Sequence, residues 1–81
     1  MEDIPDWSPE AQALDPGSKY RHFKGGEYHL LKVARDSETT EEVVVYESIE
    51  DPDRVWVRPL KMFTEEVRRD GYEGPRFKKV D

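Results

Sequence analysis

Residues 20–24 read Tyr-Arg-His-Phe-Lys, a run in which basic and aromatic side chains are interleaved. Such a run can contact phosphates through its cations while the bases of single-stranded nucleic acid stack on its rings. The alternative is structural: the aromatic side chains pack inward and the basic ones are simply hydrated. With both interpretations open, Arg21, His22 and Lys24 are candidate ligand-binding residues.

Two further arginines, Arg58 and Arg76, each alternate with apolar neighbours. We expect both side chains to project from the wall of a sheet, where together with Arg21 they could hold a carboxylate or a phosphate in bidentate fashion. The alternative is that the carboxylates within residues 38–42 already neutralise these arginines. Exposed ion pairs of that kind contribute little stability.

Trp56 is expected to share a strand face with Arg54 and Arg58. An exposed Trp56 would be a stacking platform or the anchor of an interface. A buried Trp56 would instead form a second small core against the N-terminal segment or a helix. The candidate ligand-binding residues, taken together, are Arg21, His22, Lys24, Glu38, Trp56, Arg58 and Arg76.

Catalysis finds less support in the sequence. His22 with Glu38 could form a general base and the carboxylate that orients it, but no nucleophile elbow or phosphate-binding loop accompanies them. A compact chain of 81 residues has a radius of gyration of only ~12 Å, so a cavity of ~300 Å³ would hollow out most of its core. Cysteine is absent, and the two histidines lack the spacing of metal ligands. We expect no catalysis, metal or cofactor, with a small enzyme that uses His22 as the last alternative.

Short strands are the elements that must position these residues. Residues 42–49 are rich in β-branched side chains, which favour strands. The other segments with strand character are residues 19–24, 28–35, 54–58 and 76–80. Residues 60–63, directly after Pro59, fit a single helical turn, and a short helix capped by Thr64 and ended by Gly71 follows.

These elements predict a mainly β fold, namely a small SH3-like, partly open β-barrel of about five strands with one short helix or 3₁₀ turn near the C-terminus. The alternative is a three-stranded meander with the helix across one face. The predicted core comprises Tyr28, Leu30, Val43, Val45, Ile49, Val55, Val57, Leu60, Met62, Phe63, Val67 and Phe77.

Charge is unevenly distributed along the chain, whose 13 Lys and Arg and 19 Asp and Glu give a net charge of −6. Residues 1–17 hold five acids and no base, and we interpret them as a flexible acidic N-terminal arm before a domain of residues 18–81. Trp7 in this arm either docks on the domain or awaits a partner. Without a basic and apolar leader, or an apolar run of ~20 residues, we expect a cytoplasmic protein that does not bind membranes.

The rest of the chain is banded, with a net charge of +4 over residues 19–35, −8 over residues 36–53 and +3 over residues 54–81. Pairing of a basic strand with an acidic neighbour explains this banding. The alternative is that the two basic bands meet on one surface.

Five segments together resemble one known family. They are residues 17–25 (Gly-Ser-Lys-Tyr-Arg-His-Phe-Lys-Gly), 37–39 (Ser-Glu-Thr), 44–46 (Val-Val-Tyr), 56–63 (Trp-Val-Arg-Pro, then Met-Phe) and 75–77 (Pro-Arg-Phe). In this order they resemble the small bacterial domain of unknown function DUF1653, which implies a compact, mostly β domain of bacteria or their phages without an established activity. The resemblance places the family's pattern on Arg21, His22, Lys24, Glu38, Thr39, Arg58, Pro59, Met62, Phe63, Arg76 and Phe77.

We therefore expect a noncatalytic binding module that recognises a protein or peptide partner through its sheet surface, with a monomer as the default state. The alternative ligand is nucleic acid, or another anion, bound through the basic and aromatic patch. The acidity of the whole chain argues against tight nonspecific binding to DNA, which depends on neutralising many phosphates.

Overall fold

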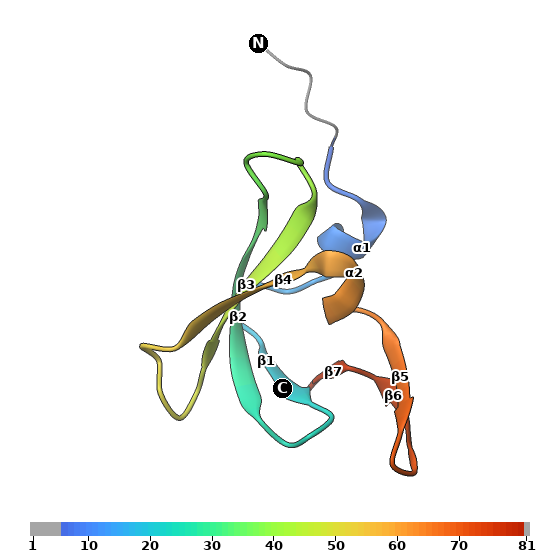
Figure 1. Cartoon of the computed structure of the whole chain (residues 1–81). Coiled ribbons are helices and arrows are strands. Elements are labelled where there is room, and N and C mark those ends of the chain that lie inside the picture. Colours follow the sequence, from blue (N-terminus) through green and yellow to red (C-terminus); the bar gives the residue numbers. More distant parts are fainter. Residues whose placement is uncertain (1–5, 81) are drawn as a thin grey trace.

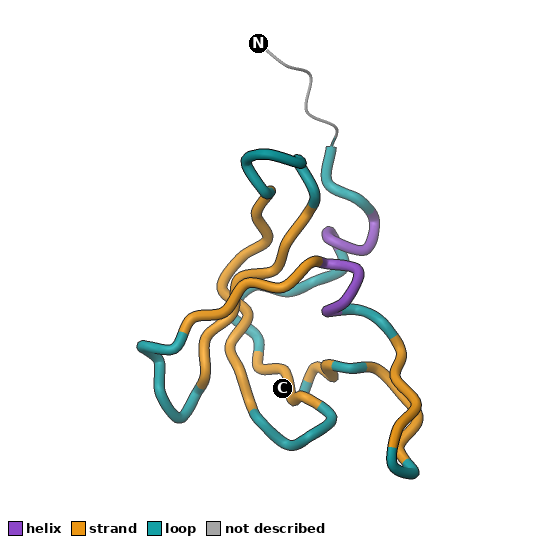
Figure 2. Tube along the Cα trace, viewed as in Figure 1, coloured by secondary structure: helices purple, strands orange, loops and turns teal. Residues whose placement is uncertain are grey.

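The computed structural model describes residues 6–80, which form a curved antiparallel sheet with a separate hairpin beside it (Figure 1). The sheet has the strand order β4-β3-β2-β1-β7, and β5 pairs with β6. The elements are α1 (Pro9–Gln12), β1 (Lys19–His22), β2 (Glu27–Arg35), β3 (Glu42–Ser48), β4 (Val55–Pro59), α2 (Leu60–Phe63), β5 (Glu66–Arg69), β6 (Tyr72–Pro75) and β7 (Phe77–Lys79). Strands supply most of the regular structure, as the colours of Figure 2 show.

The prediction of a mainly β fold with a short helix near the C-terminus is confirmed. The strands of the main sheet coincide closely with the five predicted segments, and α2 begins directly after Pro59, as expected. The sheet does not close into a barrel, since within residues 6–80 its edges β4 and β7 do not pair with each other. Over the same residues, neither helix is long and apolar enough to cross a membrane.

The helix predicted for residues 64–71 is wrong, because a hairpin occupies this segment. Arg69 pairs with Tyr72, which leaves Asp70 and Gly71 as a two-residue loop with φ angles of 50° and 81°. Positive φ at both loop residues is typical of a type I′ turn, for which Asp-Gly is a preferred sequence. The dipeptide therefore indicates a hairpin more strongly than the glycine alone indicates a helix end.

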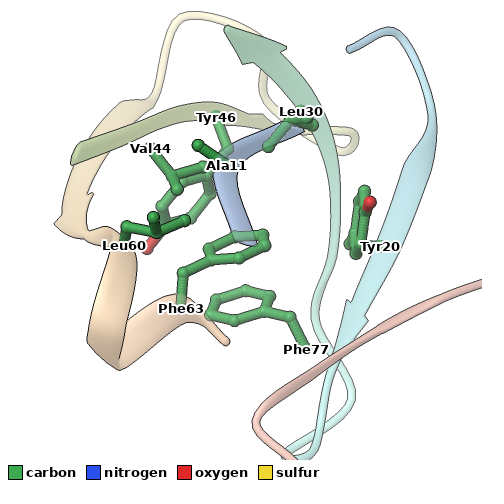
Figure 3. Packing of buried hydrophobic residues seen from close by; sticks show 8 residues of the cluster. All are labelled: Ala11, Tyr20, Leu30, Val44, Tyr46, Leu60, Phe63 and Phe77. Carbon is green, nitrogen blue, oxygen red and sulfur yellow. The ribbon is translucent and has the colours of Figure 1, made fainter. Parts of the chain in front are cut away.

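The core fills the space between one face of the sheet and the two short helices (Figure 3). The rings of Phe63 from α2 and Phe77 from β7 stack with their centroids 4.2 Å apart, and both are almost fully buried. Burial of a large apolar side chain of this kind contributes about 1.5–3 kcal/mol. The cluster comprises Ala11, Tyr20, Leu30, Val44, Tyr46, Leu60, Phe63 and Phe77.

Several residues that the sequence places in the core lie outside it. They are Val43, Val45, Ile49, Val55, Val57 and Met62. For the four valines the reason is the register of β3 against β4, in which Tyr46 pairs with Trp56 and Val44 pairs with Arg58. Residues directly opposite each other share one face of a sheet. Because β3 turns Val44 and Tyr46 inward, the alternate valines of β3 and β4 face the other way.

The N-terminal segment contacts the sheet from Trp7 onwards. Ala11 of α1 is only 6% exposed and belongs to the core cluster. The backbone N–H of Ser8 donates to Oε2 of Glu42 over 2.8 Å, and the ring of Trp7 lies under the guanidinium of Arg35, 4.6 Å from ring centroid to Cζ. Trp7 thus docks on the domain. The remainder of the expected arm, residues 1–5, lies outside the described residues.

A β-bulge interrupts the pairing of β2 with β3. Leu30 pairs with Tyr46 and Lys32 pairs with Val45, so that Leu31 has no partner opposite it. With regular alternation after Leu30, Val33 would face away from the core. The extra residue shifts the alternation by one position, so Val33 packs against the core as Leu30 does.

Candidate functional site

The candidate site is a pocket of about 310 Å³ on the core-facing side of the sheet, open to solvent at its rim. It lies where the turn after β1 approaches the ends of β2, β3, β4 and β7. Its lining residues are His22, Lys24, Gly26, Tyr28, Tyr46, Trp56, Arg58 and Phe77. Pockets of ~300 Å³ stand at the lower end of the range for small-molecule sites, so this one suits a small group rather than a large ligand.

Arg58 is the principal cation of the pocket. Its Nε donates a hydrogen bond of 3.1 Å to the hydroxyl of Tyr46, and its Cζ lies 5.6 Å from the ring centroid of Phe77. No residue between 6 and 80 forms an ion pair with Arg58. The guanidinium is therefore held by a phenol and a ring face, while its Nη atoms have no carboxylate to bind.

The other arginines of the described chain are mostly neutralised. The ion pairs with Lys or Arg are Arg21–Glu27, Arg35–Glu42, Arg54–Asp51, Arg68–Glu73, Arg76–Glu65 and Lys79–Asp15. Arg58 differs from these arginines because it has no carboxylate partner, and no acidic side chain of residues 6–80 lines its pocket. Guanidinium groups are also the side chains that recognise carboxylates and phosphates in a bidentate manner.

His22 lines the pocket, and its surroundings favour the neutral form of its imidazole. Burial lowers the pKa of its imidazole below the ordinary value, and the positive charges of Arg58, Arg76 and Lys24 lower this pKa further. Nδ1 accepts a hydrogen bond of 3.1 Å from the backbone N–H of Lys24. An accepting Nδ1 leaves the ring proton on Nε2, so the imidazole offers a further N–H donor.

Aromatic rings form the walls of the pocket. The ring of Tyr28 stands edge to face against Tyr46 at 5.2 Å and against Phe77 at 5.8 Å, measured between centroids. Trp56 remains 47% exposed at the rim. These rings present apolar faces beside polar O–H and N–H groups, a combination that suits a ligand with both apolar and acceptor groups.

Gly26 leaves room for the hydroxyl end of Tyr28. A Cβ at this position would lie 2.9 Å from the Tyr28 hydroxyl and 3.1 Å from its Cε2, closer than such atoms approach. A side chain at residue 26 would therefore displace the Tyr28 ring. The absence of a side chain here is part of the shape of the pocket.

Four of the candidate residues meet in this pocket: His22, Lys24, Trp56 and Arg58. Arg58 does not project outward from the sheet as expected, because it pairs with the buried Val44 and so faces the core side.

Arg76 lies beside the pocket and not in its lining. Its guanidinium donates to Oε1 of Glu65, over 2.9 Å from Nε, and lies 5.9 Å from the ring centroid of Phe23. The interpretation that a carboxylate within residues 38–42 neutralises Arg76 is therefore wrong, because its partner is Glu65.

Arg21 and Glu38 lie away from the site. Arg21 alternates with the buried Tyr20, so it faces the opposite side of β1, where it pairs with Glu27 at 2.8 Å. Glu38 belongs to the loop at the far end of β2, about seven strand residues from the pocket, or roughly 23 Å. The structure therefore does not bring His22 and Glu38 together.

Sequence analysis missed three aromatic residues and one glycine of the lining: Tyr28, Tyr46, Phe77 and Gly26. The sequence places Tyr28 and Phe77 in the core alone, although aromatic rings can pack on a core and border a pocket at the same time. Tyrosine, with an apolar ring and a polar tip, carried a signal for such a boundary position. Elsewhere in residues 6–80, no three His, Asp or Glu side chains gather in a way that could hold a metal ion.

Comparison with known proteins gives the chain its family. The model of a protein family of unknown function, DUF1653, matches residues 18–79. The chain belongs to the DUF1653 family. A crystal structure of a DUF1653 protein from Bordetella bronchiseptica is similar to this chain, with 38% sequence identity and a TM-score of 0.77. That similarity covers 86% of this chain and 91% of the Bordetella chain.

No curated protein matches this DUF1653 domain. The family match begins at residue 18 and thus includes every lining residue of the pocket, whereas α1 precedes it.

Proposed function

We propose that this DUF1653 domain is a noncatalytic binding module whose pocket holds an anionic group of its ligand. The observation that carries the proposal is the surplus of hydrogen-bond donors. Arg58, Lys24 and the Nε1–H of Trp56 can only donate, and no carboxylate of residues 6–80 lines the pocket. A ligand that fills this space has to supply acceptors, and a carboxylate or a phosphate supplies them together with the opposite charge.

The aromatic walls add an apolar requirement. Trp56 at the rim and Tyr28 inside the pocket offer ring faces beside the cations. A ligand whose anionic group is attached to a flat or apolar part would bury that part against the rings and place its charge near Arg58. Small aromatic acids are therefore the simplest probes of the site.

A protein or peptide partner fits the charge distribution better than a long nucleic acid. Affinity for a polyanion depends on several cations that contact successive phosphates. Here most arginines outside the pocket already have carboxylate partners, and the whole chain carries a charge of −6. Binding of a single acidic group in one pocket does not require several unpaired cations in a row, as binding of a long nucleic acid does.

The surroundings of His22 support a role without catalysis. Nδ1 of His22 accepts from a backbone N–H, and no carboxylate of residues 6–80 makes a hydrogen bond or ion pair with the ring that would orient it as a general base. The described lining of the pocket also contains no Ser, Thr, Cys, Asp or Glu that could act as a nucleophile or a second acid.

Titration with small probes, followed by nuclear magnetic resonance, tests the proposal. Benzoate and phenyl phosphate should shift the Nε–H signal of Arg58 and the Nε1–H signal of Trp56 in a saturable way, whereas neutral benzyl alcohol should shift them far less. Arg58→Gln should weaken benzoate binding roughly tenfold or more, the effect of losing a charge-assisted hydrogen bond.

Arg54→Gln is the matched control, because Arg54 lies just before the same strand and pairs with Asp51. It should leave benzoate binding within about twofold, well below the loss expected of a direct contact. Equal binding to wild type and Arg58→Gln, or no saturable shifts at high benzoate concentration, would remove the proposal. Tighter binding of a ten-nucleotide thymidine oligomer than of phenyl phosphate would favour nucleic acid as the ligand.

A further inference from the structure

β4 is an edge strand whose protection against pairing is confined to its last two residues, Arg58 and Pro59. Val55 and Val57 on its outer face are 51% and 64% exposed, and β4 pairs with β3 alone among the described strands. The opposite edge, β7, is only three residues long and carries the exposed Lys78 and Lys79. Short length and lysines are common protections against strand pairing. β4 is two residues longer than β7 and has no lysine, and its residues 55–57 carry no charge.

The backbone of β4 has free groups that point away from the sheet. The backbone N–H of Ser48 donates to the carbonyl of Arg54 over 3.0 Å, so residue 54 faces β3. Backbone groups of successive strand residues alternate in direction. The N–H and C=O groups of Val55 and Val57 therefore point outward, and so does the nitrogen of Pro59, where the missing N–H costs the sheet no internal bond.

The two faces of β4 differ in chemistry. Trp56 and Arg58 face the pocket side, and Val55 and Val57 face the other side. In an added antiparallel strand, residues opposite Trp56 and Arg58 would lie on the pocket side, and their alternate neighbours would cover the two valines. Acidic side chains complement the first face, and apolar side chains complement the second.

We propose that β4 accepts an extended segment of a partner protein in which acidic and apolar residues alternate. The segment pairs with β4 as an added strand, its apolar residues cover Val55 and Val57, and an acidic residue reaches Arg58. Main-chain hydrogen bonds supply affinity and the alternating side chains supply specificity, as in other cases of strand addition. The inference rests on the proposed function, since Arg58 is the anion-binding group of the pocket.

A second copy of this chain fits the edge less well. Symmetric antiparallel pairing of two β4 strands about Trp56 would place Arg54 of one copy opposite Arg58 of the other, and like charges directly opposite destabilise a sheet. Pairing about Val57 would place Trp56 opposite Arg58. Neither register brings a carboxylate to Arg58, so the charge of the pocket favours an acidic segment of another protein.

The heptapeptide acetyl-Thr-Val-Glu-Val-Glu-Val-Thr-amide is the probe for this edge. Added antiparallel to β4, its valines can lie opposite residues 55, 57 and 59 and its glutamates opposite residues 56 and 58. The peptide should bind saturably at low salt and protect the backbone N–H groups of Val55 and Val57 from hydrogen exchange. The same peptide with Gln in place of Glu should bind at least tenfold more weakly, as should the glutamate peptide to Arg58→Gln.

Val57→Pro removes one outward N–H while leaving the bonds between β4 and β3 in place. It should weaken the glutamate peptide at least tenfold, whereas Val57→Thr, which keeps the N–H and the branched shape, should change binding by less than threefold. Equal binding to wild type and Val57→Pro overturns the proposal. Because the exchange measurement uses wild-type protein, a failure of the proline variant to fold leaves the test intact.

The outcomes separate this inference from the proposed function. Binding of benzoate without binding of the peptide, or peptide binding that leaves Val55 and Val57 unprotected, overturns the β4 inference and leaves the anion pocket standing. A third outcome overturns both the β4 inference and the anion pocket. In that outcome the protein does not bind benzoate, and neither Arg58→Gln nor the replacement of Glu by Gln in the peptide changes the affinity for the peptide. Protection of Val55 and Val57 by higher protein concentration alone would show that the occupant is a second copy and overturn the choice of partner.

Discussion

The Nε of Arg58 donates a hydrogen bond of 3.1 Å to the hydroxyl of Tyr46, which lies on the neighbouring strand and twelve residues earlier in the chain. The ring of Tyr46 is 4% exposed and belongs to the core, while the guanidinium lines the pocket. The side chain of Tyr46 therefore connects the packing of the core to the orientation of the proposed anion-binding group.

Tyr46→Phe should loosen Arg58 without removing its charge. We expect the free energy of unfolding to fall by about 1 kcal/mol, the usual contribution of one hydrogen bond. Benzoate binding should weaken several-fold, because Arg58 is no longer held in place. Tyr72→Phe is the control: its hydroxyl donates to the carbonyl of Pro75 over 2.8 Å outside the pocket lining. This control should lose similar stability in urea denaturation and keep the wild-type affinity for benzoate.

The partly buried ion pair of Arg76 with Glu65 should contribute more to stability than a fully exposed pair such as Arg68–Glu73. The Arg76 side chain is 13% exposed, and the backbone of the same residue also bonds to Glu65 and to Phe23. Arg76→Gln should lower the free energy of unfolding by about 1–2 kcal/mol, as expected for a partly buried charged hydrogen bond.

Arg68→Gln provides the comparison for Arg76, because its pair with Glu73 has side chains that are 81% and 71% exposed. It should change stability by less than about 0.5 kcal/mol, since exposed pairs contribute little. Urea denaturation of both variants decides the matter, and equal losses would contradict a special role for Arg76.

Ala11 tests whether the N-terminal segment belongs to the folded domain. Ala11→Asp would place a carboxylate at a position that is 6% exposed, and should destabilise the protein by about 2 kcal/mol or more. Ala13→Asp introduces the same group at an exposed position of the same segment and should change stability by less than about 0.5 kcal/mol. Two thermal unfolding curves that coincide with that of the wild type would mean that this segment does not pack as described.

His22 should make the domain less stable in mild acid. Burial, with the charges of Arg58, Arg76 and Lys24, lowers the folded-state pKa, so the unfolded chain binds this proton more readily. The stabilisation is fully present above the unfolded pKa of about 6.5 and is lost as the pH falls below it towards the folded pKa.

His22→Asn is the variant that checks this pH dependence, because the amide oxygen can replace Nδ1 as the acceptor of the Lys24 N–H and does not titrate. Urea midpoints at pH 8 and pH 5 should differ less for His22→Asn than for wild type. An imidazole titration of His22 with a midpoint above the ordinary histidine value would show that the sign is wrong.

The strands were predictable because their signals are local. Residues 42–48 carry β-branched side chains in a row, and Pro59 marks the end of β4 and the start of α2. Which face turned inward was not predictable from β3 alone, since Val43 and Val45 are as apolar as Val44. Tyr46 determines which face of β3 turns towards the core, because its large ring is buried there and its hydroxyl accepts a hydrogen bond from Arg58.

The pocket was predictable in part for the same reason. Residues 20–24 and residues 56–58 pointed to cations beside aromatic rings, and the structure brings His22, Lys24, Trp56 and Arg58 together. Arg21 and Arg76 could not be excluded from sequence, because their partners Glu27 and Glu65 become neighbours only through strand pairing and the path of the chain after α2. The use of these residues in binding stays a prediction.

The extra residue Leu31 has a consequence for insertions and deletions along β2. If Leu31 were deleted, Tyr28, Leu30 and Val33 would still alternate on one side of the strand, because the bulge adds one residue to a regular pattern. A one-residue deletion at His29 would instead turn Leu30 or Tyr28 towards solvent, since a shift of one position exchanges the two faces. Chains of this architecture can therefore differ in length by one residue at position 31 and keep the same interior, a tolerance that the regular stretches of the strand lack.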